Sequence, residues 1–177
     1  MYRITELTRS GRELFHTGDL AVIWGVENKN TLYTAIKRLV SKGELVPVHK
    51  GLYSLLPLNK IDPIKLGLAV IHSYAYVSCE SVLTREGVID QVVQAITLVG
   101  SVSRRFSLAG HEYICRKLNP KFLHSSAGME TQNGVSWASA FRAVADLLYF
   151  NPQYYFDNRE KIDWSEVRQI QQEVGYV

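Results

Sequence analysis

The sequence predicts an α+β protein of two domains, residues 1–60 and residues 61–177. Apolar residues recur every three or four positions in some segments and every second position in others, which are the periods of helices and strands. A stretch rich in proline and polar residues, 57–63, separates the two parts. The first sixty residues hold nine Lys and Arg against five Asp and Glu, whereas the remainder holds eleven against twelve. A basic module that binds a polyanion is therefore expected before a nearly neutral domain.

Composition excludes several classes of protein. With 46% hydrophobic and 21% charged residues in a chain of 177, the sequence is typical of globular domains. No apolar run approaches the ~20 residues needed to cross a membrane, and the first residues lack the pattern of a signal peptide. The two cysteines, Cys79 and Cys115, form no CxxC motif, so neither a disulfide framework nor a structural zinc site is expected. We expect a protein of the reducing cytoplasm.

Three helices are expected in the first domain. A short helix lies within residues 1–13, and a second follows Thr17, whose hydroxyl is suited to cap it, and ends at Gly25. A third begins at residues 28–30 and ends before Gly43, where a left-handed residue is common. The third helix has one apolar face, with spacings of three and four: Leu32, Ala35, Ile36, Leu39 and Val40.

A β-hairpin is expected after the third helix. Residues 44–48 and 52–56 have the composition of strands, and residues 49–51 between them form a turn that contains glycine. Pro47 cannot donate a hydrogen bond to a neighbouring strand, so its strand is expected at a sheet edge. Residues 15–17 are interpreted as a connector between the first two helices.

Helix, tight turn, helix and hairpin in this order are the layout of a winged helix-turn-helix. The major groove of B-DNA, about 12 Å wide, accepts one helix if another helix holds it at the right angle. Short polar residues near the start of the third helix can reach base edges, and basic residues further along it and on the hairpin can reach phosphates. The predicted DNA-binding residues are Lys29, Asn30, Thr31, Tyr33, Thr34, Lys37, Arg38, His49 and Lys50. A solvated helix face, or a winged helix that binds only proteins, is the alternative interpretation.

The second domain is expected to mix helices with antiparallel strands. Helical patterns cover residues 64–72, 79–86, 136–149 and 164–174, the last after Asp163 as cap. Strand patterns cover residues 94–99, 104–109 and 111–117. Residues 122–135 are polar and predict a loop with some irregular strand.

Several segments, in order along the chain, match the pattern of one known family. They are residues 30–40, 43–45 and 50–53; residues 76–87, with the spacing Tyr-x-Ser-x-x-Ser and a closing glycine; the strand 95–99, followed by Arg104, Arg105 and Phe106; and the helix 138–150. Taken together, these segments resemble the AbiEi-type antitoxins over most of the chain.

The resemblance implies a bacterial two-gene toxin–antitoxin, or abortive-infection, system. The winged helix would repress the promoter of its own operon, and the second domain would counteract a nucleotidyltransferase toxin without forming a stable complex. The implied partners are double-stranded DNA and, functionally, the toxin; the sequence leaves a homodimer open. The alternative is a winged-helix regulator of another operon, whose second domain mediates dimerisation or binds a protein.

Patterns for enzymatic chemistry are weak. Residues 100–101 follow a strand as Gly-Ser does in nucleotidyltransferases, but Glu112 is the only acid in the next fifteen residues, too few to hold Mg²⁺. The segment 112–117 offers a nuclease one carboxylate and a lysine where an acidic pair is needed. Cys79 with His72 or His111 could imitate a thiol nucleophile and base, although a free cysteine is usually a small buried hydrophobe. We expect no enzyme activity, no metal and no cofactor.

Two further groups have two interpretations each. A second basic group lies on predicted strands and comprises Arg104, Arg105, Arg116 and Lys117, with Lys121 nearby. It is either ordinary solvent-facing charge or a second surface for phosphate or tRNA. An aromatic cluster comprises Tyr149, Phe150, Tyr154, Tyr155 and Phe156. It either packs the C-terminal helices together or forms an interaction surface.

Overall fold

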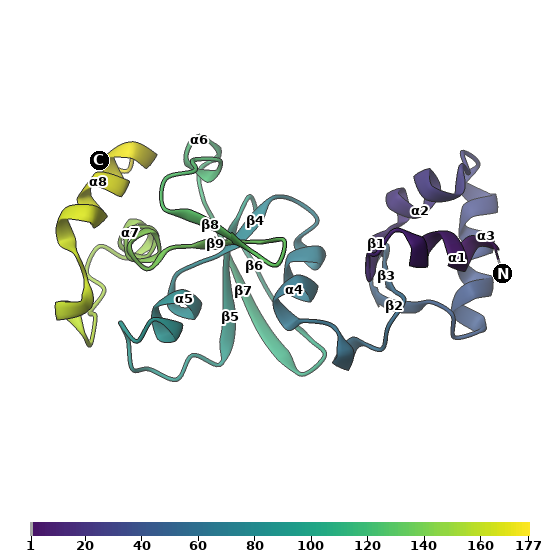
Figure 1. Cartoon of the computed structure of the whole chain (residues 1–177), viewed down its shortest axis with the longest axis horizontal. Coiled ribbons are helices and arrows are strands. Elements are labelled where there is room, and N and C mark those ends of the chain that lie inside the picture. Colours follow the sequence, from purple (N-terminus) through teal and green to yellow (C-terminus); the bar gives the residue numbers. More distant parts are fainter. Residues whose placement is uncertain (1) are drawn as a thin grey trace. The chain divides into compact units, whose positions relative to one another are not determined.

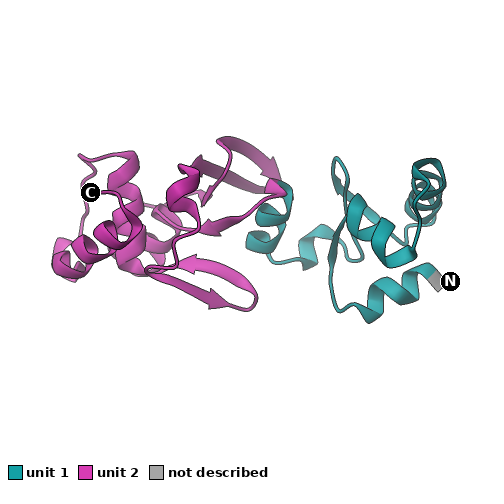
Figure 2. Cartoon of the chain, turned by 90° about the horizontal axis from the view of Figure 1, so that it is seen from above, with its two compact units in different colours: residues 1–70 teal, residues 71–177 magenta. Residues whose placement is uncertain are grey.

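A computed structural model describes residues 2–177 and shows an α+β protein with two sheets. The chain forms two compact units, unit 1 of residues 1–70 and unit 2 of residues 71–177 (Figure 2). The expected boundary lay ten residues earlier, in the stretch rich in proline. In the structure this stretch contains the 3-10 helix η1 (Leu58–Lys60) and the start of helix α4 (Pro63–Ile71).

Unit 1 consists of helices packed with a small three-stranded sheet (Figure 1). Its elements are α1 (Tyr2–Arg9), β1 (Leu14–His16), α2 (Thr17–Trp24), α3 (Lys29–Ser41), β2 (Val46–His49) and β3 (Leu52–Ser54). The sheet has the order β1-β3-β2 with antiparallel pairings, so the strand of Pro47 lies at an edge, as predicted. The interpretation of residues 15–17 as a connector was wrong. Phe15 and His16 pair with β3, a long-range partner that three residues of local sequence do not reveal.

The core of unit 1 lies where its helices meet the sheet. The buried side chains are Leu7, Phe15, Leu20, Leu32, Ile36, Leu39 and Leu45. Helix α2 ends at Gly25, which is left-handed with φ 60°, and the N–H of Val26 then donates to the Ala21 carbonyl at 3.0 Å. Gly25 and Val26 therefore form the sharp turn that the sequence predicts between α2 and α3.

The cap of α2 differs from the prediction. The N-cap position is held by His16, whose backbone N–H donates to the Asp19 carboxylate at 2.8 Å. Thr17 is the first residue of the helix, and its hydroxyl donates to the Gly51 carbonyl at 3.2 Å. The Thr17 backbone N–H donates to the same carbonyl at 2.9 Å. Because β1 pairs with β3, Thr17 lies beside the hairpin turn. Its hydroxyl therefore binds the turn and does not cap the helix.

Unit 2 is a six-stranded sheet with helices on one side. Its strands are β4 (Ala75–Val77), β5 (Ala95–Gly100), β6 (Arg104–Leu108), β7 (His111–Lys117), β8 (Met129–Gln132) and β9 (Val135–Ala138). Its helices are α5 (Glu80–Arg85), α6 (Pro120–Leu123), α7 (Ala140–Phe150) and α8 (Trp164–Val174), with the 3-10 helix η2 (Arg159–Lys161). Helices α5 and α7 lie on the same side of the sheet, and α8 packs outside α7 (Figure 1).

The sheet of unit 2 is mixed, whereas antiparallel strands were expected. In the order β6-β7-β5-β4-β9-β8, β5 pairs with β7 and β4 pairs with β9 in parallel, and the other pairings are antiparallel. After β5 the chain forms β6 at the edge of the sheet, then turns back as β7, which lies between β6 and β5 and runs parallel to β5. Parallel pairing results from this long-range order, which local sequence does not encode.

Boundaries around α7 also differ from the prediction. The expected loop over residues 122–135 contains the end of α6 and all of β8, and the expected helix start at residue 136 is part of β9. Helix α7 begins only after Ser139, whose hydroxyl accepts from the Arg142 N–H at 3.2 Å. By contrast, α8 has the predicted bounds, and Asp163 caps it by accepting from the Ser165 N–H at 2.9 Å. Between residues 2 and 177, no helix combines the length and the apolar character needed to span a membrane.

Candidate nucleic-acid interface

Helix α3 presents a basic face to solvent. The Asn28 side chain caps the helix by accepting from the Thr31 N–H at 3.1 Å, and Leu32, Ile36 and Leu39 bury its opposite side. Residues 29–42 contain four basic residues and no Asp or Glu. The basic residues are Lys29, Lys37, Arg38 and Lys42, and all four are exposed. No carboxylate of the helix itself therefore offsets these charges.

A groove of about 640 Å³ lies between α1 and α3. Three cationic side chains line it: Arg3 from α1, and Arg38 and Lys42 from α3. Asn30, Thr31 and Thr34 add neutral hydrogen-bonding groups, and Ala35 and Leu39 form an apolar floor. None of the residues that line the groove is acidic. The groove therefore has the chemistry of an anion-binding site.

Arg3 is held at the groove by Trp24 of α2. The guanidinium carbon lies 5.3 Å from the centre of the indole ring, a cation–π distance. The indole Nε1–H donates to the carbonyl of Arg3 at 3.2 Å, so both the backbone and the side chain of this residue contact the tryptophan. These contacts reduce the number of conformations available to Arg3 before any ligand binds.

The predicted DNA-binding residues are distributed over three places. Asn30, Thr31, Thr34 and Arg38 line the groove. Lys29, Tyr33 and Lys37 lie elsewhere on the exposed surface of α3, and Tyr33 is 54% exposed. His49 and Lys50 lie at the tip of the hairpin, next to the Gly51 carbonyl that binds Thr17.

Two residues of the groove are not among the predicted set. Lys42 follows Arg38 by four positions and so lies one helical turn beyond it, a spacing that the sequence displays. Arg3 lies in a different helix, and only the packing of α1 against the rest of unit 1 brings it to the groove. No local sequence signal indicates that position.

The second basic group does not form one surface. Successive side chains of a strand point to opposite faces of its sheet. In the β6–β7 register, Arg104 pairs with Cys115 and Arg105 pairs with Ile114. Arg104 and Lys117 therefore lie on one face of the sheet, and Arg105 and Arg116 lie on the other.

Arg116 is engaged within unit 2. Its guanidinium binds both carboxylate oxygens of Glu80, at 2.5 and 2.6 Å. The hydrogen bonds with Glu80 raise the pKa of Arg116 above its usual value. This ion pair joins β7 to the first turn of α5.

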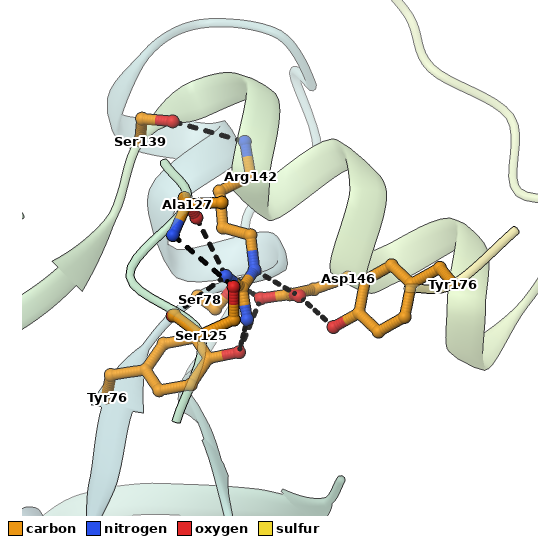
Figure 3. A network of polar contacts seen from close by, with 8 residues as sticks. All are labelled: Tyr76, Ser78, Ser125, Ala127, Ser139, Arg142, Asp146 and Tyr176. Carbon is orange, nitrogen blue, oxygen red and sulfur yellow. Dashed lines mark hydrogen bonds and ion pairs between the residues drawn. The ribbon is translucent and has the colours of Figure 1, made fainter. Parts of the chain in front are cut away.

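Unit 2 contains a buried ion pair that sequence analysis did not single out. Arg142 and Asp146, four residues apart on α7, are both 0% exposed, and the Arg142 Nε donates to Asp146 Oδ1 at 2.8 Å. Figure 3 shows the guanidinium enclosed by polar partners. It also donates to the carbonyls of Ser125 and Ala127, at 3.3 and 2.7 Å, and to the Tyr76 hydroxyl at 2.9 Å.

Asp146 accepts four hydrogen bonds in this network (Figure 3). Oδ1 accepts from Arg142 and from the Tyr176 hydroxyl at 2.5 Å, and Oδ2 accepts from the hydroxyls of Tyr76 at 3.0 Å and Ser78 at 2.7 Å. Burial, and then the Asp146 carboxylate, raise the pKa of Tyr76 above its ordinary value. Burial alone would lower the pKa of Arg142, but Asp146 reverses this effect and raises it. The network thus connects β4, α7 and the segment after α8.

A neighbouring set of hydrogen bonds fixes α5 on β5. The Thr97 hydroxyl accepts from the Ser81 N–H at 2.8 Å and donates to the Ser78 carbonyl at 2.6 Å. The Ser81 hydroxyl accepts in return from the Thr97 N–H at 2.7 Å. Among the side chains of residues 3–177, no buried nitrogen or oxygen lacks a partner. These polar groups therefore serve as satisfied core contacts.

The cysteines lie in the interior of unit 2. Cys79 is 0% exposed, and burial, followed by the charge of Asp146, raises the pKa of its thiol. Burial raises the pKa of Cys115 to about 11. A thiolate nucleophile needs access and a lowered pKa, and neither cysteine has them.

The aromatic cluster is largely packed. Tyr149 stacks on Tyr176 with ring centres 4.7 Å apart, and Phe156 contacts the ring of Trp164 at 6.1 Å. The first contact joins α7 to the segment after α8, and the second joins the segment after α7 to α8. Two members remain exposed in part: Tyr149 is 40% exposed and Tyr155 is 67% exposed.

No protein-family model matches this sequence, and no curated protein matches it. The geometry of the basic face and of the groove therefore carries the functional proposal.

Proposed function

We propose that unit 1 is a winged helix-turn-helix that binds double-stranded DNA, and that the protein is a transcriptional repressor of its own operon. Helices α2 and α3 would form the helix-turn-helix, and β2 and β3 the wing. The order of elements in unit 1 supports this proposal, because α1, β1, α2, α3, β2 and β3 follow one another as such a fold requires.

The basic face of α3 is the observation that carries the proposal. Four cations and several short polar side chains lie on one exposed helix, without a carboxylate among residues 29–42. A helix of this kind fits the major groove, where neutral polar side chains read base edges and cations bind phosphates. A face used only for a protein partner would need apolar anchors, and Tyr33 is the single large apolar side chain exposed on α3.

Binding to promoter DNA tests this function. The full chain should bind a duplex from its own promoter more tightly than a scrambled duplex, with an affinity that falls as salt rises because counterions are released on binding. Fluorescence anisotropy over a salt series measures both quantities. Equal affinity for the two duplexes at moderate salt would exclude the repressor role.

We also propose that unit 2 acts as the antitoxin of an AbiEi-type system and counteracts a nucleotidyltransferase toxin. The buried hydrogen bonds of unit 2 support this proposal. Tyr76, Ser78, Ser81 and Thr97 lie in segments that resemble the family, and their hydrogen bonds connect β4, α5, β5 and α7. The residues that carry the family resemblance are thus residues whose hydrogen bonds hold the elements of unit 2 together. The proposal includes no catalytic step.

Co-expression with the neighbouring toxin gene tests the antitoxin role. The full chain should restore growth, and Arg38→Ala should still restore it although it represses the promoter less. A full chain that fails to restore growth beside a toxic neighbour would exclude this role and leave the DNA-binding role intact.

A further inference from the structure

The groove between α1 and α3 has features that the basic face of α3 does not explain. Its cations come from two helices, and one of them, Arg3, is already held against Trp24. Its floor, Ala35 and Leu39, is apolar. A ligand that combines negative oxygens with aliphatic carbons would satisfy both parts of the groove.

We infer that this groove binds the phosphodiester backbone of one DNA strand. Arg3 and Lys42 contact its phosphates and so contribute affinity that does not depend on the DNA sequence. The inference rests on the proposed DNA-binding function and extends it to α1. Phosphate oxygens would accept from the forked N–H groups of Arg3 and Arg38 and from the Lys42 ammonium. The deoxyribose carbons would contact the apolar floor.

The cations of the groove lie to one side of the middle of the exposed face of α3. At 100° per residue, Asn30, Thr34 and Lys37 lie near that middle, so Asn30 and Thr34 form the edge of the groove that faces the bases. Arg38 and Lys42 lie on the flank that borders α1. A helix inserted with its middle toward the bases places this flank beside one strand of the duplex. The groove then follows the backbone of that strand.

Trp24 is the positioning residue for this contact. Its ring lies against the Arg3 guanidinium, and its Nε1–H fixes the carbonyl of the same residue. An arginine ordered in this way loses less conformational freedom on binding than a free surface arginine. Arg3→Lys retains the charge but not the planar guanidinium. The DNA affinity of this variant should therefore lie between that of the native protein and that of Arg3→Ala.

Salt-dependent binding of the full chain to promoter and random duplexes tests the inference. Each phosphate contact contributes ~0.9 to the slope of log K against log salt concentration. Arg3→Ala and Lys42→Ala should each lower this slope by ~0.9 and weaken binding about eightfold at 0.1 M salt, equally for both duplexes. Arg9→Ala is the matched control, because Arg9 is exposed in the last turn of the same helix and does not line the groove.

The outcomes separate the groove from the repressor role. Losses from Arg3→Ala and Lys42→Ala that exceed those from Arg9→Ala, on both duplexes, support the groove even if the promoter is not preferred. If the promoter is preferred but Arg3→Ala, Lys42→Ala and Arg9→Ala weaken binding equally, the proposed role of the groove is overturned and the repressor role remains. Tighter binding of an RNA duplex than of DNA would overturn the choice of ligand. Absence of binding to any duplex at low salt would overturn both proposals. Circular dichroism confirms that each variant is folded.

Discussion

Removal of either charge of the Arg142–Asp146 pair should destabilise unit 2 strongly. Asp146→Ala leaves the guanidinium fully buried without a counter-charge and deprives the hydroxyls of Tyr76, Ser78 and Tyr176 of their acceptor. Breaking a buried ion pair costs about 3–5 kcal/mol. Arg142→Met should cost a similar amount, because it leaves a buried carboxylate whose remaining partners are neutral.

The double variant Arg142→Met/Asp146→Ala should be more stable than the sum of the two single effects predicts. Neither buried charge then remains, so the shortfall from additivity should be about 2–3 kcal/mol. Tyr176→Phe provides a mild member of the series. It removes one hydrogen bond to Asp146 and retains the ring that stacks on Tyr149, so it should cost about 1–2 kcal/mol.

Urea unfolding followed by tryptophan fluorescence measures these changes. A Trp24→Phe background leaves Trp137 and Trp164 as the reporters, and both belong to unit 2. Full additivity of the two single variants would show that the charges do not stabilise each other. A cost below about 1 kcal/mol for both single variants would refute the calculation from buried charge.

Three other perturbations have defined outcomes. Thr34→Ala should reduce the preference for promoter over random DNA by about 1–3 kcal/mol, whereas Arg38→Ala should weaken both equally; anisotropy distinguishes them. Tyr76 keeps its proton in the folded state because its pKa is raised, whereas the unfolded chain ionises near its ordinary value of 10.0. Stability of unit 2 should therefore fall above pH 10, by about 1.4 kcal/mol per pH unit from this residue. Tyr76→Phe should remove that contribution from urea unfolding curves, and an unchanged pH dependence would contradict it. Gly128→Ala should lower the melting temperature far more than Gly134→Ala: both glycines have positive φ, but only at Gly128 would a Cβ lie 2.7 Å from the Cβ of Arg142.

Local signals in the sequence predict the helices better than the sheets. Helix α3 was located from the spacing of its apolar residues, from the polar residues 28–30 at its start and from Gly43 just past its end, and α8 was located from its cap Asp163. These signals act within a few residues of the chain. Strand β1 and the parallel pairs β5–β7 and β4–β9 depend on partners far away in the sequence, so no local pattern specifies them.

The same distinction applies to the candidate site. Asn30, Thr31, Thr34 and Arg38 were identified from one helix, whereas Arg3 reaches the groove only through the packing of α1. The pair Arg142 and Asp146 was missed because opposite charges four residues apart are typical of exposed helices. The residues around this pair, however, indicate a buried helix. Apart from these two, every residue of α7 is apolar or aromatic, and a helix of this composition is typically buried.

The basic residues of the two units differ in their surroundings as well as in their number. Among the described residues, Arg85, Arg116 and Arg142 of unit 2 each form an ion pair with a carboxylate, and the last pair is fully buried. Such pairs contribute little to the field outside the protein, because their opposite charges lie 2.5–2.9 Å apart, which is short compared with the Debye length of ~8 Å. In unit 1, Arg12 is likewise paired with Asp19, but no carboxylate lines the groove that holds Arg3, Arg38 and Lys42. Arg3, Arg38 and Lys42 therefore keep their full attraction for a polyanion, and removal of any of these three charges should lower the salt dependence of DNA binding.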